Sequence, residues 1–181
     1  MRSIILNLAV SLDGYIEGPN GEYDWCLTDQ DYGLNELLQR VDAWFIGRRS
    51  YELMCTMPDN GGLPRMKEYV FSNSLTEVRE GARLVRGDIA AEVARIRREP
   101  GKDIWLFGGA ALTASLLQLG LVDEFQLAVH PLLLGGGKPL FQEAADRTQL
   151  ELTGTQAYDS GLVVLRYRVK KDGEEGDRTA G

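Results

Sequence analysis

The amino-acid sequence predicts an α/β fold, with a mostly parallel central sheet, helices on both faces and a C-terminal antiparallel hairpin. Short, nearly continuous apolar runs, which are typical of strands covered on both faces, alternate along the chain with segments of helical periodicity. The apolar pattern then finishes in two alternating runs, Gln149–Ala157 and Leu162–Val169, joined by a turn. These observations favour a parallel sheet with an antiparallel finish.

Length and composition fit one domain. The chain has 181 residues, of which 44% are hydrophobic and 26% charged, and both fractions are ordinary for a globular protein. We expect a single domain over residues 1–169. Almost nothing is apolar in residues 170–181, so we expect them to form a disordered tail.

The first half of the chain predicts two strands and two helices. Ile4–Ser11 is apolar almost throughout and indicates a central strand. Thr28–Asp31 resembles a helix start, and a helix of about four turns is expected to end at Val41, because apolar residues recur at helical spacing in Leu34, Leu37, Leu38 and Val41. Ala43–Ile46 is a short buried strand that breaks at Gly47 and passes directly into a helix.

The second half follows the same rules. Met57–Arg65 holds two prolines and two glycines and is expected to be a loop. Asp88 can cap the helix that follows it, and Gly120 can end the next one. The expected elements are strands Glu68–Ser72 and Ala82–Arg86, helix Ile89–Glu99, strand Asp103–Gly109, helix Ala110–Leu119 and strand Glu124–His130.

Three of these strands end in small residues, Gly47, Ser72 and Gly108. Ligands of open α/β sheets bind beyond the carboxyl ends of the strands, so the three ends converge on one candidate site. A helix that begins there offers free backbone N–H groups and the positive end of its dipole. Arg48, Arg49 and Ser50 follow Gly47, and this combination favours an anion, most simply a phosphate. The alternative is that the arginines are solvated surface charges and Ser50 caps a helix.

Several other classes of site are disfavoured. A net charge of −7 without basic runs argues against nucleic-acid binding. Two cysteines and one histidine cannot assemble an ordinary zinc site; we interpret Cys26 and Cys55 as small buried hydrophobic residues and His130 as a structural residue. No G-x-G-x-x-G follows a predicted strand, and no P-loop motif occurs. No run approaches the roughly 20 apolar residues that span a membrane, and no signal-peptide pattern is present, so we expect a cytoplasmic protein.

Five segments carry a resemblance to a known family. They are Ser11–Gly14, Gly47–Glu52, Val70–Ser72, Phe107–Gly109 and Pro131–Phe141. In this order they resemble the dihydrofolate reductase-like superfamily, and specifically stand-alone proteins related to the C-terminal reductase domain of the bifunctional riboflavin biosynthesis deaminase-reductase. The resemblance extends to about Val169. The zinc motif of the deaminase half is absent, so the resemblance covers one domain only.

The resemblance implies a dihydrofolate reductase-like three-layer fold and hydride transfer from NADPH. It assigns the cofactor phosphates to Gly47, Arg48, Arg49 and Ser50. Ser72 would lie near the adenosine 2′-phosphate, and Gly108 and Gly109 near the pyrophosphate.

The substrate side is implied less directly. In dihydrofolate reductases an acid lies early in the first helix after a tryptophan; here Trp25 is followed by Asp29 and Asp31, and the spacing favours Asp31 as the proton donor. Capping of a helix is the other interpretation of both aspartates, and a water could supply the proton. Asp13 would lie near the substrate, or simply form a turn before Gly14. Trp25 could stack on a flat heterocycle or cover the core.

The loop around Gly136 is expected to close over the same cleft. The leading hypothesis is therefore an NADPH-dependent reductase of a heterocycle that resembles 5-amino-6-(5-phosphoribosylamino)uracil or a pteridine. The alternatives are a catalytically idle NADP-binding regulatory protein and a true dihydrofolate reductase. Family members are often homodimers, and the C-terminal hairpin could supply the interface.

Overall fold

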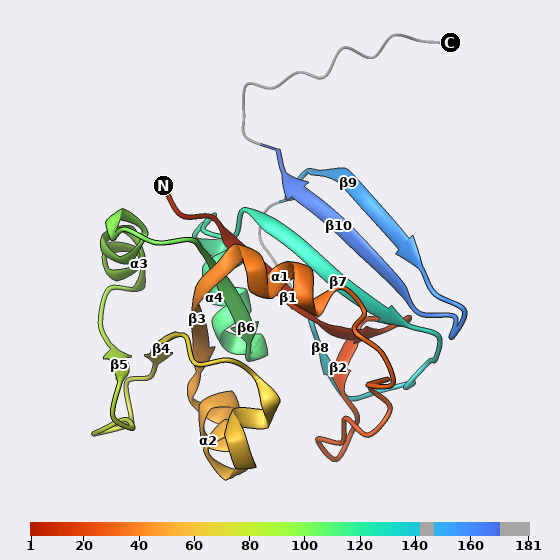
Figure 1. The fold of residues 1–181 in the computed structure, drawn as a ribbon, viewed down its shortest axis with the longest axis horizontal. Helices are drawn as coiled ribbons and strands as arrows, with labels where there is room; N and C mark the ends of the chain where they lie inside the picture. The colour runs from red at the N-terminus through yellow and green to blue at the C-terminus, as the bar shows by residue number, and fades with distance from the viewer. Residues whose placement is uncertain (142–146, 171–181) are drawn as a thin grey trace, which may run out of the picture.

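The chain folds around an eight-stranded sheet (Figure 1), which the computed structural model describes over residues 1–141 and 147–170. The eight strands of this sheet are β1 (Ile4–Ser11), β3 (Val41–Gly47), β4 (Lys67–Phe71), β5 (Ala82–Val85), β6 (Asp103–Gly108), β7 (Glu124–His130), β9 (Leu150–Ala157) and β10 (Val163–Val169). Two short strands, β2 (Tyr15–Glu17) and β8 (Lys138–Pro139), form a separate antiparallel pair. The order in the large sheet is β5-β4-β3-β6-β1-β7-β10-β9. Neighbours from β5 to β7 are parallel, and β10 is antiparallel to β7 and β9. The predicted parallel sheet with an antiparallel hairpin is confirmed.

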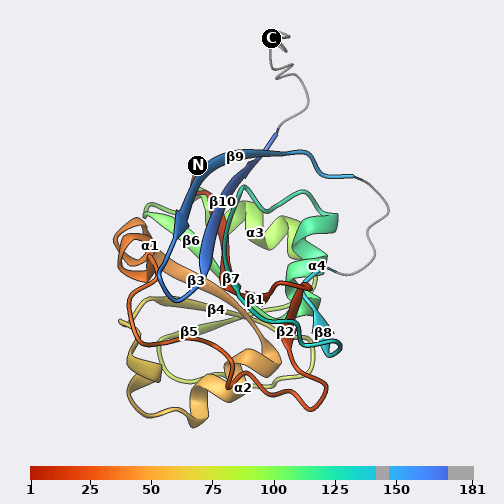
Figure 2. The same cartoon turned by 90° about the vertical axis from the view of Figure 1, so that its right-hand side faces the viewer.

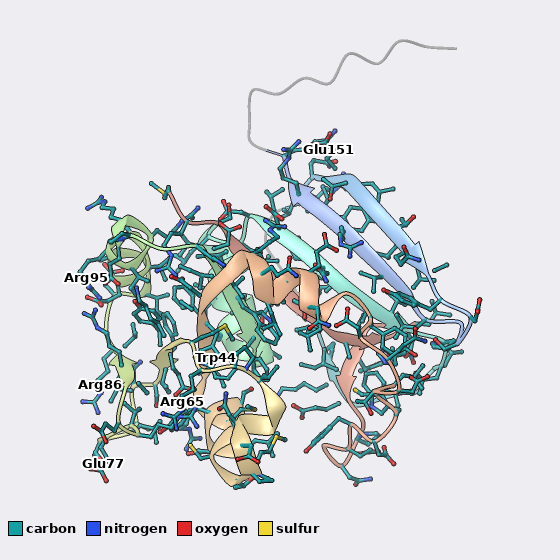
Figure 3. The ribbon with its side chains drawn as sticks, viewed as in Figure 1. Trp44, Arg65, Glu77, Arg86, Arg95 and Glu151 are labelled. Carbon is teal, nitrogen blue, oxygen red and sulfur yellow. The ribbon has the colours of Figure 1, made fainter. Side chains whose placement is uncertain are left out.

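Helices cover both faces of this sheet, as predicted. They are α1 (Leu34–Arg40), α2 (Arg48–Thr56), α3 (Ile89–Arg98) and α4 (Ala110–Gln118), with a 3-10 turn η1 (Pro58–Gly62). Buried residues of α1 and α2 share one core cluster with Trp44, and those of α3 and α4 share another with Phe45. Trp44 and Phe45 are consecutive residues of β3 and point to opposite faces of the sheet, because side chains alternate along a strand. Figure 2 shows α1 and α4 on opposite sides of the sheet, and Figure 3 labels Trp44.

The first helix differs from its prediction. It begins at Leu34 and has 7 residues, so the expected start over Thr28–Asp31 is wrong. Tyr32 and Gly33 have φ angles of 49° and 82°, and a right-handed helix cannot continue through two such residues. The apolar periodicity correctly located the body of the helix, but it could not detect this left-handed turn.

Most other boundaries agree with the sequence analysis to within a residue or two. The Asp88 carboxylate accepts a hydrogen bond from the Ala91 backbone N–H at 3.1 Å and so caps α3. Gly120 has φ 62°, and the following Leu121 N–H donates to the Leu116 carbonyl at 2.9 Å, as in a glycine-terminated helix. The expected loop after α2 contains η1, which the sequence did not predict. Residues 171–181 of the expected tail lie outside the described residues.

The two cysteines are free thiols. Cys26 is partly buried, but Cys55 is exposed, so the expectation that both are buried is wrong for Cys55. It lies near the end of α2, where the apolar face is supplied by Tyr51 and Met54 instead. Within the described part of the chain, no helix is long and apolar enough to cross a membrane.

Candidate functional site

A cavity of about 770 Å³ lies at the carboxyl ends of the parallel strands. Its walls come from the ends of β3, β4 and β5 and from the first turns of α2 and α4. The sequence-predicted residues that line it are Gly47, Arg48, Arg49, Ser50, Ser72 and Gly109. Gly108 does not line the cavity but directly precedes Gly109. The structure thus brings the three predicted strand ends together.

Two helix N-termini meet at this cavity. Gly47 precedes α2 and Gly109 precedes α4, and neither helix has a side-chain cap, so their first backbone N–H groups stay available. The two helices start from paired strands, since Ile46 of β3 is in register with Gly108 of β6. Each N-terminus carries roughly half a positive charge. Together they favour an anion with more than one phosphate.

Gly109 lies where these two turns meet, and its backbone conformation favours glycine. Its φ angle is 95°, which side chains rarely adopt, and a Cβ there would lie 3.5 Å from the Ser50 Oγ and 3.8 Å from the Gly47 Cα. A side chain at this position would enter the space above the two helix starts. The glycine therefore leaves a cradle that a phosphate can approach closely.

The two predicted arginines differ in their surroundings. Arg48 lies 3.7 Å from Glu52, one helical turn on, and both side chains are about half exposed. Arg49 is exposed and, within the described residues, makes no hydrogen bond or ion pair. Of the two, Arg49 is therefore the one whose guanidinium is not already engaged.

A second polar corner surrounds Ser72. The Ser72 Oγ accepts hydrogen bonds from the backbone N–H groups of Ser74 at 3.2 Å and Leu75 at 3.1 Å, which fixes the turn after β4. Arg86, labelled in Figure 3, follows β5 directly. It lines the cavity and donates to the Leu75 carbonyl. The sequence analysis assigned no role to Arg86. The strand-end rule that selected Ser72 would have selected Arg86 as well.

The remaining wall comes from the small antiparallel pair β2–β8. Glu17 of β2 and Lys138 of β8 line the cavity and lie 3.8 Å apart. Gly137 packs against this pair so closely that a Cβ would overlap the Glu17 carbonyl oxygen. Nothing local in the sequence predicted this pairing, because its two strands are far apart along the chain.

Asp13 binds the glycine loop. Its carboxylate accepts hydrogen bonds from the Ser11 hydroxyl at 2.6 Å and from the backbone N–H groups of Leu134 at 3.1 Å and Gly135 at 2.8 Å. These bonds, the one from Ser11 foremost, lower the pKa of Asp13 below its ordinary value. Asp13 is therefore ionised at neutral pH and anchors the loop that contains Gly136.

Asp31 makes its contacts away from Asp13 and the loop that contains Gly136. Its carboxylate accepts hydrogen bonds from the backbone N–H groups of Gly33 at 3.1 Å and Asn35 at 2.9 Å, at the start of α1. The neighbouring Asp29 accepts one from the Tyr32 hydroxyl at 2.7 Å. The capping interpretation thus describes the contacts of Asp31, and its role as a proton donor stays a prediction.

Trp25 packs against the single histidine of the chain. The rings of Trp25 and His130 meet edge to face, with centroids 5.2 Å apart. His130 is 2% exposed, and both of its ring nitrogens are hydrogen-bonded, which agrees with the structural interpretation. Across the described residues, no group of three or more histidine, cysteine, aspartate or glutamate side chains is arranged to hold a metal ion.

The fold and the cavity define an α/β protein whose sheet edge suits a phosphate-bearing ligand. The model of the RibD C-terminal domain family matches residues 2–164, and the chain therefore belongs to this family. It is 43% identical to the uncharacterized protein YyaP of Bacillus subtilis (strain 168), over 92% of this chain and 94% of YyaP.

Solved structures agree with this assignment. A putative riboflavin biosynthesis protein from Shewanella sp. PV-4 is 28% identical, with a TM-score of 0.81 over 93% of this chain and 99% of that one. Dihydrofolate reductase from Enterococcus faecalis, complexed with NADP(H), shares the fold at 16% identity, with a TM-score of 0.69 over 93% of this chain and 97% of that one. The dihydrofolate reductase-like fold is confirmed, and family membership indicates an oxidoreductase.

Proposed function

We propose that the chain is an NADPH-dependent reductase that transfers hydride to a small heterocycle resembling 5-amino-6-(5-phosphoribosylamino)uracil or a pteridine. The observation that carries the proposal is the meeting of the uncapped starts of α2 and α4 in one cavity with Arg49, Ser72 and Arg86. A fold neighbour, the Enterococcus faecalis dihydrofolate reductase, is complexed with NADP(H). The Shewanella relative is named as a putative riboflavin biosynthesis protein.

The cavity fits the phosphates of NADPH at two places. The pyrophosphate would lie against the first turns of α2 and α4, where Gly109 leaves room that a Cβ would fill. The adenosine 2′-phosphate would lie beside Ser72 and Arg86, with Arg49 near the mouth. A charge-assisted hydrogen bond of this kind contributes about 1.5–3 kcal/mol. One such arginine would favour NADPH over NADH by about tenfold or more.

The nicotinamide supplies hydride, and the protein must hold the heterocycle and provide a path for a proton. Asp13, as an ionised carboxylate, serves as a hydrogen-bond acceptor and holds the glycine loop. The proton would then come from Asp31 or from a water. Trp25 and Gly136 would border the heterocycle, beyond the ends of β1 and β7.

Calorimetric titration with NADPH and with NADH tests the cofactor half of the proposal. We expect NADPH to bind at least about tenfold more tightly; equal affinities, or no binding of either, would contradict it. Turnover is tested by following NADPH absorbance with 5-amino-6-(5-phosphoribosylamino)uracil, pteridines and dihydrofolate. Tight NADPH binding without any oxidation would favour the idle NADP-binding protein, and rapid oxidation with dihydrofolate alone would favour a true dihydrofolate reductase.

A further inference from the structure

The segment between β2 and α1, residues 18–33, has no helix or strand and crosses the carboxyl edge of the sheet (Figure 1). At its far end, the Gly33 carbonyl accepts a hydrogen bond from the Gln126 side chain at 3.2 Å, and the Tyr32 hydroxyl bonds to the Ser160 hydroxyl at 3.0 Å. Its middle, around Trp25 and Leu27, needs a separate attachment. His130 provides it.

His130 is the last residue of β7, and its ring contacts the segment directly. The Nε2 atom accepts a hydrogen bond from the Leu27 backbone N–H at 3.0 Å, over a separation of 103 residues. The Nδ1 atom lies 2.9 Å from the carbonyl oxygen of Ala128. Because a carbonyl oxygen only accepts and the Leu27 N–H only donates, both bonds form together in the neutral ring that carries its proton on Nδ1.

The same ring fixes the orientation of Trp25. The two rings are nearly perpendicular, at 86°, with centroids 5.2 Å apart, which is a favourable edge-to-face arrangement. The Trp25 Nε1 donates to the Glu22 carbonyl at 3.3 Å within the segment itself. Because His130 is buried and hydrogen-bonded at both ring nitrogens, it supports the indole from the side of the sheet.

The strand order places this contact next to the cavity. β1 lies between β6 and β7, and Ser11 at the end of β1 is in register with His130. The cavity occupies the ends of β3, β4 and β5, together with the start of the helix that follows β6. A compound that receives hydride would lie beyond the end of β1, between the cavity and Trp25.

We infer that His130 is a positioning residue, which holds Trp25 and Leu27 against the substrate side of the site through its Nδ1-protonated tautomer. The inference rests on the proposed function for its catalytic consequence, but the attachment itself does not. His130 does not line the cavity. It acts through the segment that it holds.

The attachment can be measured without any ligand. The chain has one histidine, so nitrogen-15 NMR of the ring reports this residue alone, and we expect Nδ1 protonated and Nε2 unprotonated at neutral pH. The Leu27 amide should exchange slowly with deuterated solvent in the wild-type protein and at least about tenfold faster in His130→Leu. His130→Gln retains an acceptor and should restore most of the protection.

Gln126→Leu is the matched control, because Gln126 is also buried on β7 and holds the same segment at Gly33. It should leave Leu27 exchange within twofold of the wild-type rate. The opposite tautomer, or Leu27 exchange that is equal in the wild-type and His130→Leu proteins, would overturn the inference. The wild-type NMR result decides this even if a variant fails to fold.

The catalytic consequence is tested with 5-amino-6-(5-phosphoribosylamino)uracil. In His130→Leu we expect its KM to rise at least tenfold, the NADPH Kd to stay within twofold, and His130→Gln to recover most of the loss. Equal losses in KM and in NADPH affinity would indicate a merely structural residue and overturn the inference. Absence of turnover by the wild-type protein would count against the proposed function alone, because the NMR and exchange results need no substrate.

Discussion

The cofactor side and the substrate side of this site are built by different means. On the cofactor side, two strand–glycine–helix units, at Gly47–Ser50 and Gly108–Ala110, each supply a ready-made helix N-terminus from contiguous residues. On the substrate side, two attachments join distant parts of the chain: Asp13 to Gly135 over 122 residues and Leu27 to His130 over 103. The proposed phosphate site is thus encoded locally, whereas the proposed substrate wall depends on the completed sheet. Changes on one side should therefore leave the other largely intact.

The largest effect is expected at Gly109. An alanine there fills the space above the two helix starts, so Gly109→Ala should weaken NADPH binding by about 10–100-fold, as the loss of charge-assisted contacts would. Gly120→Ala is the matched control at the other end of α4, where φ is also positive but the surrounding space is open. Gly120→Ala should lose roughly 1–2 kcal/mol of stability, because the φ of 62° is that of the left-handed region. Gly109→Ala should lose at least as much, because φ 95° and ψ 114° lie outside that region. Equal NADPH affinities of the two variants, measured by calorimetry, would show that the space left by Gly109 does not hold a phosphate.

Substitutions of the arginines distinguish which of them would bind the phosphates of NADPH. Arg86→Ala should reduce the preference for NADPH over NADH by roughly tenfold. Arg49→Ala should weaken the binding of NADPH by a similar factor. Arg48→Ala should have a smaller effect because Arg48 already lies near Glu52. Arg83→Ala is the control. Arg83 lies on β5, the strand that Arg86 directly follows, but it pairs with Glu99 at 3.4 Å and does not line the cavity. The dissociation constants of NADPH and NADH measure each effect. If Arg86→Ala lost as much affinity for NADH as for NADPH, Arg86 would not bind the 2′-phosphate.

Asp13→Asn probes the substrate side. The side-chain NH2 of asparagine would face a backbone N–H group of Leu134 or Gly135, which now donates a hydrogen bond to the carboxylate. The KM for the heterocycle should therefore rise several-fold, while the affinity for NADPH changes less than twofold. Because folding lowers the Asp13 pKa from 3.8, its stabilising contribution is complete above pH 3.8 and disappears as the pH falls through the lowered value. Urea unfolding at pH 7 and at pH 3 should show the wild-type advantage shrinking at the lower pH. An advantage that is independent of pH would contradict the assignment.

The smallest effect concerns the thiols. Cys55 is exposed, whereas burial, together with the nearby Asp24 carboxylate, raises the pKa of Cys26 to about 11. A disulfide reagent at pH 8 should therefore modify one thiol quickly and one slowly. Cys55→Ser should remove the fast phase and leave NADPH binding unchanged. A fast phase that persists in Cys55→Ser would show that the segment around Cys26 is open.

The sequence predicted what depends on local pattern. Apolar runs located the strands of the large sheet, and the strand-end rule selected Gly47, Ser72 and Gly108. Gly47 and Ser72 line the cavity, and Gly108 directly precedes Gly109, which lines it. It also applied to Arg86, which was overlooked. The start of α1 was misplaced because Tyr32 adopts a positive φ that no residue pattern indicates.

The β2–β8 pair and its Glu17–Lys138 contact could not be predicted either. β2 and β8 follow β1 and β7 in the chain, and these two longer strands are paired in the sheet. A single sequence carries no record of such long-range contacts. The same reason explains why His130 was interpreted as a structural residue without its partner Leu27 being identified. The long-range contacts, Glu17–Lys138 at the cavity and His130–Leu27 beside it, were accordingly the features that the sequence did not predict.

A crystal structure of the protein grown with NADPH would show directly whether the starts of α2 and α4 hold the cofactor phosphates. We expect the pyrophosphate against the first turns of α2 and α4, the 2′-phosphate beside Ser72 and Arg86, and the nicotinamide directed toward the end of β1 at Ser11. Phosphates bound against other residues, or a cavity that stays empty at saturating NADPH, would contradict this expectation.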